Sequence, residues 1–506
     1  MSHIARSTLI VAVFFGLEKG LGFLRQIIIA RQFGLSKELD AFNAANNLPD
    51  LLFALISGGA LAMALIPVLA EYLEEQGHPQ AWKLFSRIAN LIFLVTAGVS
   101  ILLAIFAEPL VSWRLGVAPG FEAVQQALVA DLMRLNLIAT VLFSLAGLAI
   151  AGLQANQHFL LPALAPSMYD IGALFGAIIL APQTGYQIGP ITLPAFGLGV
   201  HGLVYGTILG ALLFLGIQIP GLLRFKFRWS PSLGIGSPGV RRVLLLMGPR
   251  VFNVLFIQAV FLAQDNLASR LEAGAVTALV YGWLFMQVPE SLIGTAIGTV
   301  LLPTLAEQNT RRNWEAYRRT LNQTIRVILA LTLPSAFLLA FAIRPLVGLL
   351  DFSAAGTELV VWTTRAYLVG LVGHSLLEIG VRAFYARQNA LTPLIAAGAA
   401  FAGFILLGAP LAFGLGAPGI ALANSLVYTG EALVLLYLLH RLFPGILDVR
   451  STLPRVAVGA VISGGLVYLL MGFPFHPLLL AAGALAAGGA LALVFIWPEI
   501  RLLIKL

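Results

Sequence analysis

The stretch LEKGLGFLRQIIIARQFG, residues 17–34, has an apolar helical pattern that carries Glu18, Lys19 and Arg25 well inside it. A charged side chain near the centre of a bilayer costs at least ~2.5 kcal/mol, so such residues usually have a function. The surrounding run, residues 7–32, is long enough to cross a membrane, because a span needs about 20 mostly apolar residues. We therefore interpret the stretch as part of a membrane helix with functional charges.

The composition of the whole chain agrees with this interpretation. The 506 residues are 59% hydrophobic and only 10% charged, whereas soluble domains are about 25% charged. There is no cysteine, the seven histidines show no metal-ligand spacing, and no phosphate-binding loop or nucleophile motif occurs. We expect an all-α polytopic membrane protein that is not an enzyme and has no metal, no cofactor and no nucleic-acid partner.

Hydropathy predicts fourteen membrane helices, and the basic residues orient them. Nineteen Lys and Arg residues fall at the ends that face one side and five at the other, which places both termini in the cytoplasm under the positive-inside rule. The chain is then a multi-pass protein of the cytoplasmic (inner) membrane. The predicted spans lie near 7–32, 41–72, 85–107, 123–153, 160–181, 197–221, 241–269, 275–306, 322–343, 356–386, 392–412, 417–439, 453–471 and 477–496.

Repeated segments indicate an internal duplication. IPVLAEY at 66–72 recurs as LPTLAEQ at 302–308, and QANQHFLLP at 154–162 recurs as YARQNALTP at 385–393. Two six-helix lobes with the same orientation would face a central cavity, as in transporters built from parallel repeats. The predicted organisation is an N-lobe over 1–222, a basic cytoplasmic linker over 223–240, a C-lobe over 241–443, and two further helices over 444–506. The linker is either a lipid-contacting segment or a plain inside loop.

Several motifs together resemble one transporter family. GFLRQIIIARQFG, DAFNAANNLPDLL, IPVLAEY, GTVLLPTLAE and FYARQNALTP are similar to segments of the MurJ/MviN proteins, lipid II flippases of the multidrug, oligosaccharidyl-lipid and polysaccharide (MOP) exporter superfamily. The resemblance covers about residues 5–440. It implies alternating access, a lipid-linked muropeptide (polyprenyl pyrophosphate) as substrate, and a groove for the lipid tail at the last two helices. Membrane lipids and cell-wall synthesis proteins are the partners it suggests, and we expect a monomer.

The sequence departs from the family pattern where arginines are usual. Phe53 and Leu284 stand at two such positions, and Lys19 stands at a third. Arginine binds phosphate through a bidentate fork, whereas lysine is a point charge. The cargo could therefore be another polyprenyl-linked oligosaccharide or an amphipathic small molecule.

Charged residues and prolines inside the spans are the candidate functional residues. We predict that a first group lines the cavity: Lys19, Arg25, Asp50, Glu290, Arg250 and Arg365. A second group is assigned to gating or structure: Glu18, Asp40, Pro49 and Pro289. A structural pair between Lys19 and Asp50 is the alternative to cavity lining. Helical spacing favours local pairs for Asp131 with Arg134 and for Glu378 with Arg382. Without a nucleotide site, membrane potential or a monovalent cation is the expected energy source, with Asp265 as a candidate cation ligand.

Overall fold

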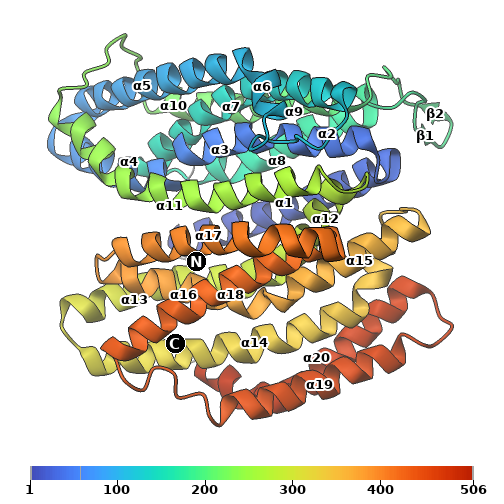
Figure 1. The fold of residues 1–506 in the computed structure, drawn as a ribbon. Helices are drawn as coiled ribbons and strands as arrows, with labels where there is room; N and C mark the ends of the chain where they lie inside the picture. Colours follow the sequence, from blue (N-terminus) through green and yellow to red (C-terminus); the bar gives the residue numbers. More distant parts are fainter. Residues whose placement is uncertain (1–2, 57–58, 504–506) are drawn as a thin grey trace. The chain divides into compact units, whose positions relative to one another are not determined.

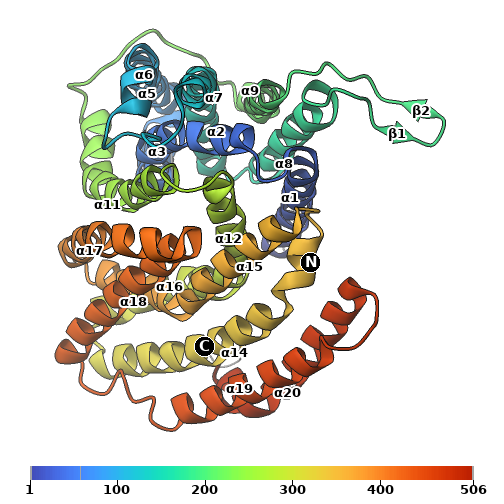
Figure 2. The ribbon, with the colours of Figure 1, turned by 45° about the vertical axis from the view of Figure 1, so that its right-hand side comes forward.

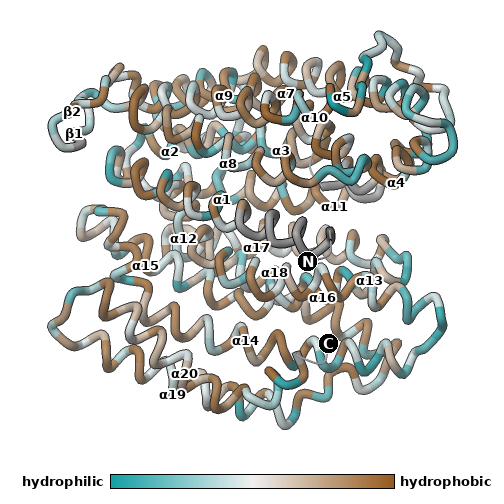
Figure 3. Tube along the Cα trace, turned by 180° about the vertical axis from the view of Figure 1, so that it is seen from behind, coloured by the Kyte–Doolittle hydropathy of each residue, from teal (hydrophilic) through white to brown (hydrophobic). Residues whose placement is uncertain are grey.

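Helices make up almost all of the protein, which is described here by a computed structural model covering residues 3–56 and 59–503. The chain divides into two compact units, Met1–Asn266 and Leu267–Leu506. Figures 1 and 2 show both units as bundles of helices. In Figure 3, hydrophobic residues run along the helices and hydrophilic residues lie mainly near the helix ends. The predicted all-α membrane fold is confirmed.

The first unit contains eleven helices, a π-helical turn and a two-stranded hairpin among the residues that the structure describes. In chain order they are α1 (His3–Phe33), α2 (Lys37–Ala45), α3 (Asn47–Ile56), α4 (Gly59–Glu75), α5 (Gly77–Ile105), α6 (Ala107–Ser112), α7 (Ala123–Ala155), α8 (Leu160–Phe175), η1 (Gly176–Leu180), β1 (Gln187–Ile188), β2 (Ile191–Thr192), α9 (Val200–Gly216), α10 (Ile219–Arg224) and α11 (Pro238–Ala268). The antiparallel strands β1 and β2 pair Gln187 with Thr192.

The second unit follows with nine helices and a second π-helical turn in its described part. They are α12 (Ala275–Glu290), η2 (Ser291–Thr295), α13 (Ala296–Thr310), α14 (Trp314–Gly348), α15 (Ala354–Val369), α16 (Leu371–Ala386), α17 (Leu391–Leu415), α18 (Ala417–Leu442), α19 (Thr452–Leu470) and α20 (Pro477–Leu503).

Each of the fourteen predicted ranges contains a helix, but several are broken. By length and apolar composition, ten helices of the described part can cross a membrane, or eleven if α15 and α16, bent by 41°, are one span. The count of fourteen and the lobe boundaries remain predictions. Most of α11 groups with the first unit, although the repeat assigned its residues to the second lobe.

The second predicted span is interrupted at Asn46, between α2 and α3. The Asn46 side chain donates to the carbonyl oxygen of Phe42 at 3.0 Å, an interaction that competes with helix continuation. Pro49 falls in the first turn of α3, where its missing N–H leaves no hydrogen bond unmade. The residues at the break, Asn46, Pro49 and Asp50, line the cavity described below.

Glycines bring α8 and η1 into backbone contact with α9. A Cβ on Gly172 would lie 2.3 Å from the nitrogen of Gly210, and one on Gly176 would lie 2.6 Å from the Cα of Gly206. Glycines four residues apart form one face of each helix, and in membranes such small-residue faces allow close packing. The position of α8 in the bundle is therefore set by direct backbone contact.

The linker between α10 and α11 is docked on α5. Asn90 donates to the carbonyl oxygens of Ser230 at 2.8 Å and Ser232 at 2.9 Å, and the Trp229 indole donates to Asn90 Oδ1 at 2.8 Å. Trp82 also donates to the carbonyl oxygen of Phe225 at 2.9 Å. These contacts fix the path of the linker on its own unit.

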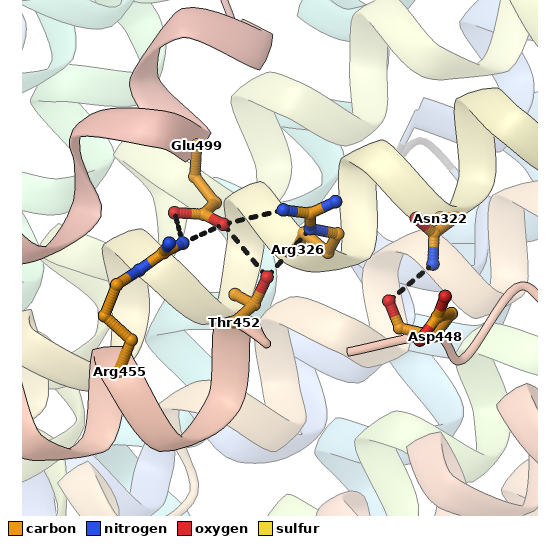
Figure 4. A network of polar contacts seen from close by, with 6 residues as sticks. All are labelled: Asn322, Arg326, Asp448, Thr452, Arg455 and Glu499. Carbon is orange, nitrogen blue, oxygen red and sulfur yellow. Dashed lines mark hydrogen bonds and ion pairs between the residues drawn. The ribbon is translucent and has the colours of Figure 1, made fainter. Parts of the chain in front are cut away.

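In the second unit, the C-terminal helices α19 and α20 pack on α14 (Figure 1). Figure 4 shows the Glu499 cluster, formed by Glu499 of α20, Arg326 of α14, and Thr452 and Arg455 of α19. Glu499 is fully buried and accepts hydrogen bonds from Arg455 at 2.5 and 2.6 Å, from Thr452 at 2.9 Å and from Arg326 at 3.1 Å. One buried carboxylate therefore joins three helices.

Candidate binding cavity

A cavity of about 340 Å³ opens within the first unit. It lies between α1, the break between α2 and α3, and helices α7, α8 and α9. Its charged lining side chains are Glu18, Arg25, Asp50 and Asp170. The predicted residues Glu18, Arg25, Asp50 and Pro49 are all among the lining residues. The helix break is thus part of the wall.

Arg25 and Asp170 form the central ion pair of the cavity. Arg25 Nη1 donates to Asp170 Oδ1 at 2.8 Å, and the two side chains are only 16% and 3% exposed. The guanidinium carbon also lies 5.0 Å from the centre of the Tyr169 ring, within the range of a cation–π interaction. The positive charge of Arg25 is therefore balanced by Asp170, and both contacts of its side chain come from α8.

Asp170 lines the cavity but was not among the residues predicted from the sequence. It is the only charged residue in the predicted span 160–181, and a lone acid in an apolar helix is a signal for function. Its partner Arg25 is 145 residues away in sequence, so spacing could not have identified the pair.

Lys19 lies beside Glu18 on α1. The Lys19 ammonium is 3.4 Å from the Glu18 carboxylate, and its side chain is 61% exposed. No ion pair of Asp50 occurs in the described part of the chain, so the suggested structural pair between Lys19 and Asp50 is wrong. Lys19 was predicted to line the cavity, but it is not among the described lining residues, which include three carboxylates and Arg25.

Two asparagines add neutral polar groups to the wall. Asn136 of α7 donates to Asn46 Oδ1 at 2.8 Å. The side-chain oxygen of Asn136 is buried and accepts no hydrogen bond from the residues that the structure describes. An unmade hydrogen bond of this kind costs about 1–3 kcal/mol. The cavity therefore offers a buried acceptor to a ligand hydroxyl or amide.

A cluster of aromatic rings also lines the cavity. Phe143 packs edge-on against Phe53, Tyr169 and Phe214, with ring centres 5.9, 5.3 and 5.6 Å apart. Phe53 occupies the position where the resemblance implies an arginine. The cavity therefore has an apolar surface at this position, and Arg25 is the only Arg or Lys among the described lining residues.

The remaining predicted residues of the first unit lie elsewhere. Asp40 is buried on α2, and Asp265 of α11 accepts a hydrogen bond from Asn47 at 2.8 Å. No group of three or more metal-ligating side chains occurs among the described residues. The side chain of Arg250 lies outside the described residues.

The predicted pair Asp131–Arg134 is wrong, because Asp131 contacts His201 at 3.3 Å and Arg134 contacts Glu108 at 3.0 Å.

The second unit places Glu290 directly before the π-helical turn η2. Thr295 donates to its carboxylate at 3.2 Å. Pro289 directly precedes Glu290 on α12, and Leu284 lies on the same helix.

The predicted local pair of Glu378 with Arg382 is confirmed. Arg365 donates to the carbonyl oxygen of Ala340 at 3.0 Å and stacks on Trp362. Arg365 thus bonds to the backbone of α14.

Comparisons with known proteins agree on one family. The sequence profile described as "Lipid II flippase MurJ" matches residues 29–482. A relative from Burkholderia cenocepacia named "Lipid II flippase MurJ" is 32% identical over 403 residues, covering 78% of this chain and 75% of the relative. A "Probable lipid II flippase MurJ" from Vibrio cholerae is 27% identical over 487 residues, covering 92% and 89%.

Solved structures match the fold over most of the chain. The structure titled "Lipid II flippase MurJ, inward closed conformation" has a TM-score of 0.80 at 22% identity, with 98% of this chain and 100% of that chain covered. An inward-facing multidrug transporter of the MATE family and MOP superfamily has a TM-score of 0.67 at 14% identity, covering 86% and 98%. The fold is that of MOP-type membrane transporters.

Proposed function

The chain belongs to the lipid II flippase MurJ family, and from this premise we propose that it moves lipid II from the inner to the outer leaflet of the cytoplasmic membrane. Its predicted mechanism is alternating access between its two lobes. The substrate is a lipid-linked peptidoglycan precursor, and the process serves peptidoglycan synthesis and cell shape.

The ion pair between Arg25 and Asp170 is the observation that carries the mechanism. A diphosphate leaving water needs cationic partners, since desolvating an ion without them costs several kcal/mol. Arg25 supplies a bidentate fork for that role, and Asp170 holds it while the cavity is empty. On substrate entry, the diphosphate replaces Asp170 as the partner of Arg25. Lys19, next to the cavity-lining Glu18 on α1, adds a second positive charge near the site.

The exchange of partners explains why three carboxylates are tolerated in this cavity. A permanently cationic site would retain the diphosphate, and transport also requires its release. Asp170 competes with the cargo for Arg25 and favours release. Glu18 likewise competes for Lys19. Membrane potential or a monovalent cation is the proposed energy source, and the chain acts as a monomeric transporter, not an enzyme, with both termini in the cytoplasm.

A second candidate cargo is favoured by one observation. The rings around Phe143 replace a family arginine at Phe53, so the cavity offers more apolar surface than phosphate-binding surface. This favours another polyprenyl-linked oligosaccharide or an amphipathic small molecule. Cell-wall synthesis proteins are proposed partners in either case.

Rescue of cells depleted of their own MurJ tests the proposal. The wild-type chain should restore growth and the accessibility of lipid II at the outer leaflet. Arg25→Ala should abolish both at normal protein level, and Arg25→Lys should restore them only in part because the fork is lost. Arg344→Ala, which removes an exposed arginine paired with Glu358, is the matched control. Wild-type levels of the chain without rescue would rule out lipid II as cargo.

Asp170→Asn distinguishes a holding role from a purely structural one. If Asp170 competes with the cargo, the variant should bind a soluble diphosphate, such as geranyl pyrophosphate, more tightly than wild type while transporting more slowly. A merely structural Asp170 would instead give lower protein level with unchanged or weaker binding.

A further inference from the structure

A second cavity, of about 1010 Å³, lies in the first unit away from the Arg25 site. We call it the loop pocket. Its walls are the end of α1, the start of α2, part of α7, and the connection 181–199 between η1 and α9. The predicted orientation places this connection outside the cell membrane.

The wall made by the connection is firmly held. Four successive amides, from Phe196 to Gly199, donate to the carbonyl oxygens of Ile179, Pro182, Leu180 and Ala181 at 2.8–3.1 Å. Leu193 donates to Tyr186 at 2.9 Å and extends the hairpin of β1 and β2. Gly197 and Gly199 have φ values of +68° and +56°, which favour glycine. The pocket is therefore pre-formed.

The lining chemistry of the loop pocket is polar but almost uncharged. It contains Gln32, Gln183, Gln187 and Tyr186, and among the described lining residues Glu38 is the only carboxylate and none is Lys or Arg. His201 also lines the pocket, and its ring lies 3.3 Å from the Asp131 carboxylate. The Tyr186 hydroxyl is a donor at neutral pH, because the ordinary pKa of a phenol is about 10 and partial burial raises the pKa further. Such a lining does not suit phosphate. Amide groups both donate and accept, as neighbouring sugar hydroxyls do.

Gln32 supplies independent evidence for a ligand. Its side-chain oxygen is buried and accepts no hydrogen bond from the described residues, although buried acceptors are nearly always satisfied. The apolar residues Phe33, Leu198 and Val200 also line the pocket and match the apolar face of a sugar ring. The volume is at the upper end of the range for small-molecule sites, roughly 300–1000 Å³.

We propose that the loop pocket binds the N-acetylated glycan head group of the cargo at the outer side of the protein. This inference rests on the proposed function, which supplies a cargo with two such sugars. The diphosphate is bound by Arg25, and the sugars are bound separately, by neutral amides. The pocket receives the head group as it leaves the membrane.

Binding of N,N′-diacetylchitobiose to the purified full chain tests the proposal. Saturation-transfer NMR in detergent should show binding by the wild-type chain. Gln32→Leu and the double variant Gln183→Ala with Gln187→Ala should each weaken it by about fivefold or more, as expected for the loss of one or two neutral hydrogen bonds. Gln32→Leu removes an unsatisfied buried acceptor, so its thermal stability should not fall. The control is Gln76→Ala, at the N-cap of α5, where the side chain makes no capping bond.

The outcomes separate this proposal from the proposed function. No wild-type binding, or equal binding by all variants, would overturn the glycan site, whereas rescue of MurJ-depleted cells would still support lipid II transport. Sugar binding without rescue would support the pocket and contradict the cargo assignment. A binding signal that maltose at equal concentration competes away would show a site for sugars in general, and would overturn the assignment to N-acetylated sugars.

Discussion

Replacing Glu499 by glutamine should destabilise the protein more than any exposed charge change in the second unit. Glu499 is fully buried and bonds to Arg326, Arg455 and Thr452 at 2.5–3.1 Å. Removing one partner of a buried pair costs about 3–5 kcal/mol. The guanidinium side chains are 26% and 34% exposed, so water recovers part of this cost, and glutamine keeps one acceptor. We expect a loss of about 2–3 kcal/mol.

The assay is thermal unfolding of the purified chain, followed by intrinsic tryptophan fluorescence, in which Trp497 of α20 is a local reporter. The expected fall in Tm is roughly 5 °C, from the usual scaling for a unit of this size. Glu315→Gln is the matched control, because Glu315 pairs with Arg319 at 2.9 Å while both side chains are about 70% exposed, and its Tm should change by less than ~1 °C. Equal Tm values for the two variants would refute the assigned role of the Glu499 cluster.

Three further predictions concern packing, the linker and topology. Gly176→Leu should prevent the contact of η1 with α9 and abolish accumulation of folded protein, whereas Gly98→Leu, at an open position, should be tolerated; immunoblots of membranes measure both. Asn90→Ala should undock the linker and speed its tryptic cleavage in inside-out vesicles, and an unchanged rate would contradict the docking role. Because the chain lacks cysteine, Ile188→Cys should react with an impermeant maleimide from outside and Ser230→Cys only from inside; the reverse pattern would overturn the orientation.

The helices were predictable because hydropathy acts locally along the chain. Each predicted span contains a helix, and the membrane fold follows from composition alone. The interruption at Asn46 was not predicted, because residues 41–72 were interpreted as one continuous span. The Asn46 side chain bonds to the backbone of its own helix and competes with helix continuation, a local effect that hydropathy averaged over a long window does not detect.

The candidate site was predictable in part. Charges inside spans identified Arg25, Asp50 and Glu18, because desolvation makes such residues costly wherever they lie. The partners of those charges depend on tertiary packing. Asp170 meets Arg25 only because α8 packs against α1, and Asp131 meets His201 rather than Arg134 because α9 packs against α7. The spacing rule fails there since interhelical neighbours compete with residues on the same helix.

The backbone contact between α8 and α9 also determines which parts of the first unit can shift. Two helices that touch at Gly172, Gly176 and their partners have no flexible side chains between them to absorb a displacement. The two helices therefore move as one rigid body, and Asp170 keeps a fixed position relative to α9. Against it, α1 presents Gly22, where the nearest atoms to an added Cβ are the Asp170 oxygens at 3.8 Å. Any motion that separates Arg25 from Asp170 is thus a displacement of α1 relative to α8 and α9. The helix break at Asn46 is the place where the neighbouring chain can bend to accommodate it.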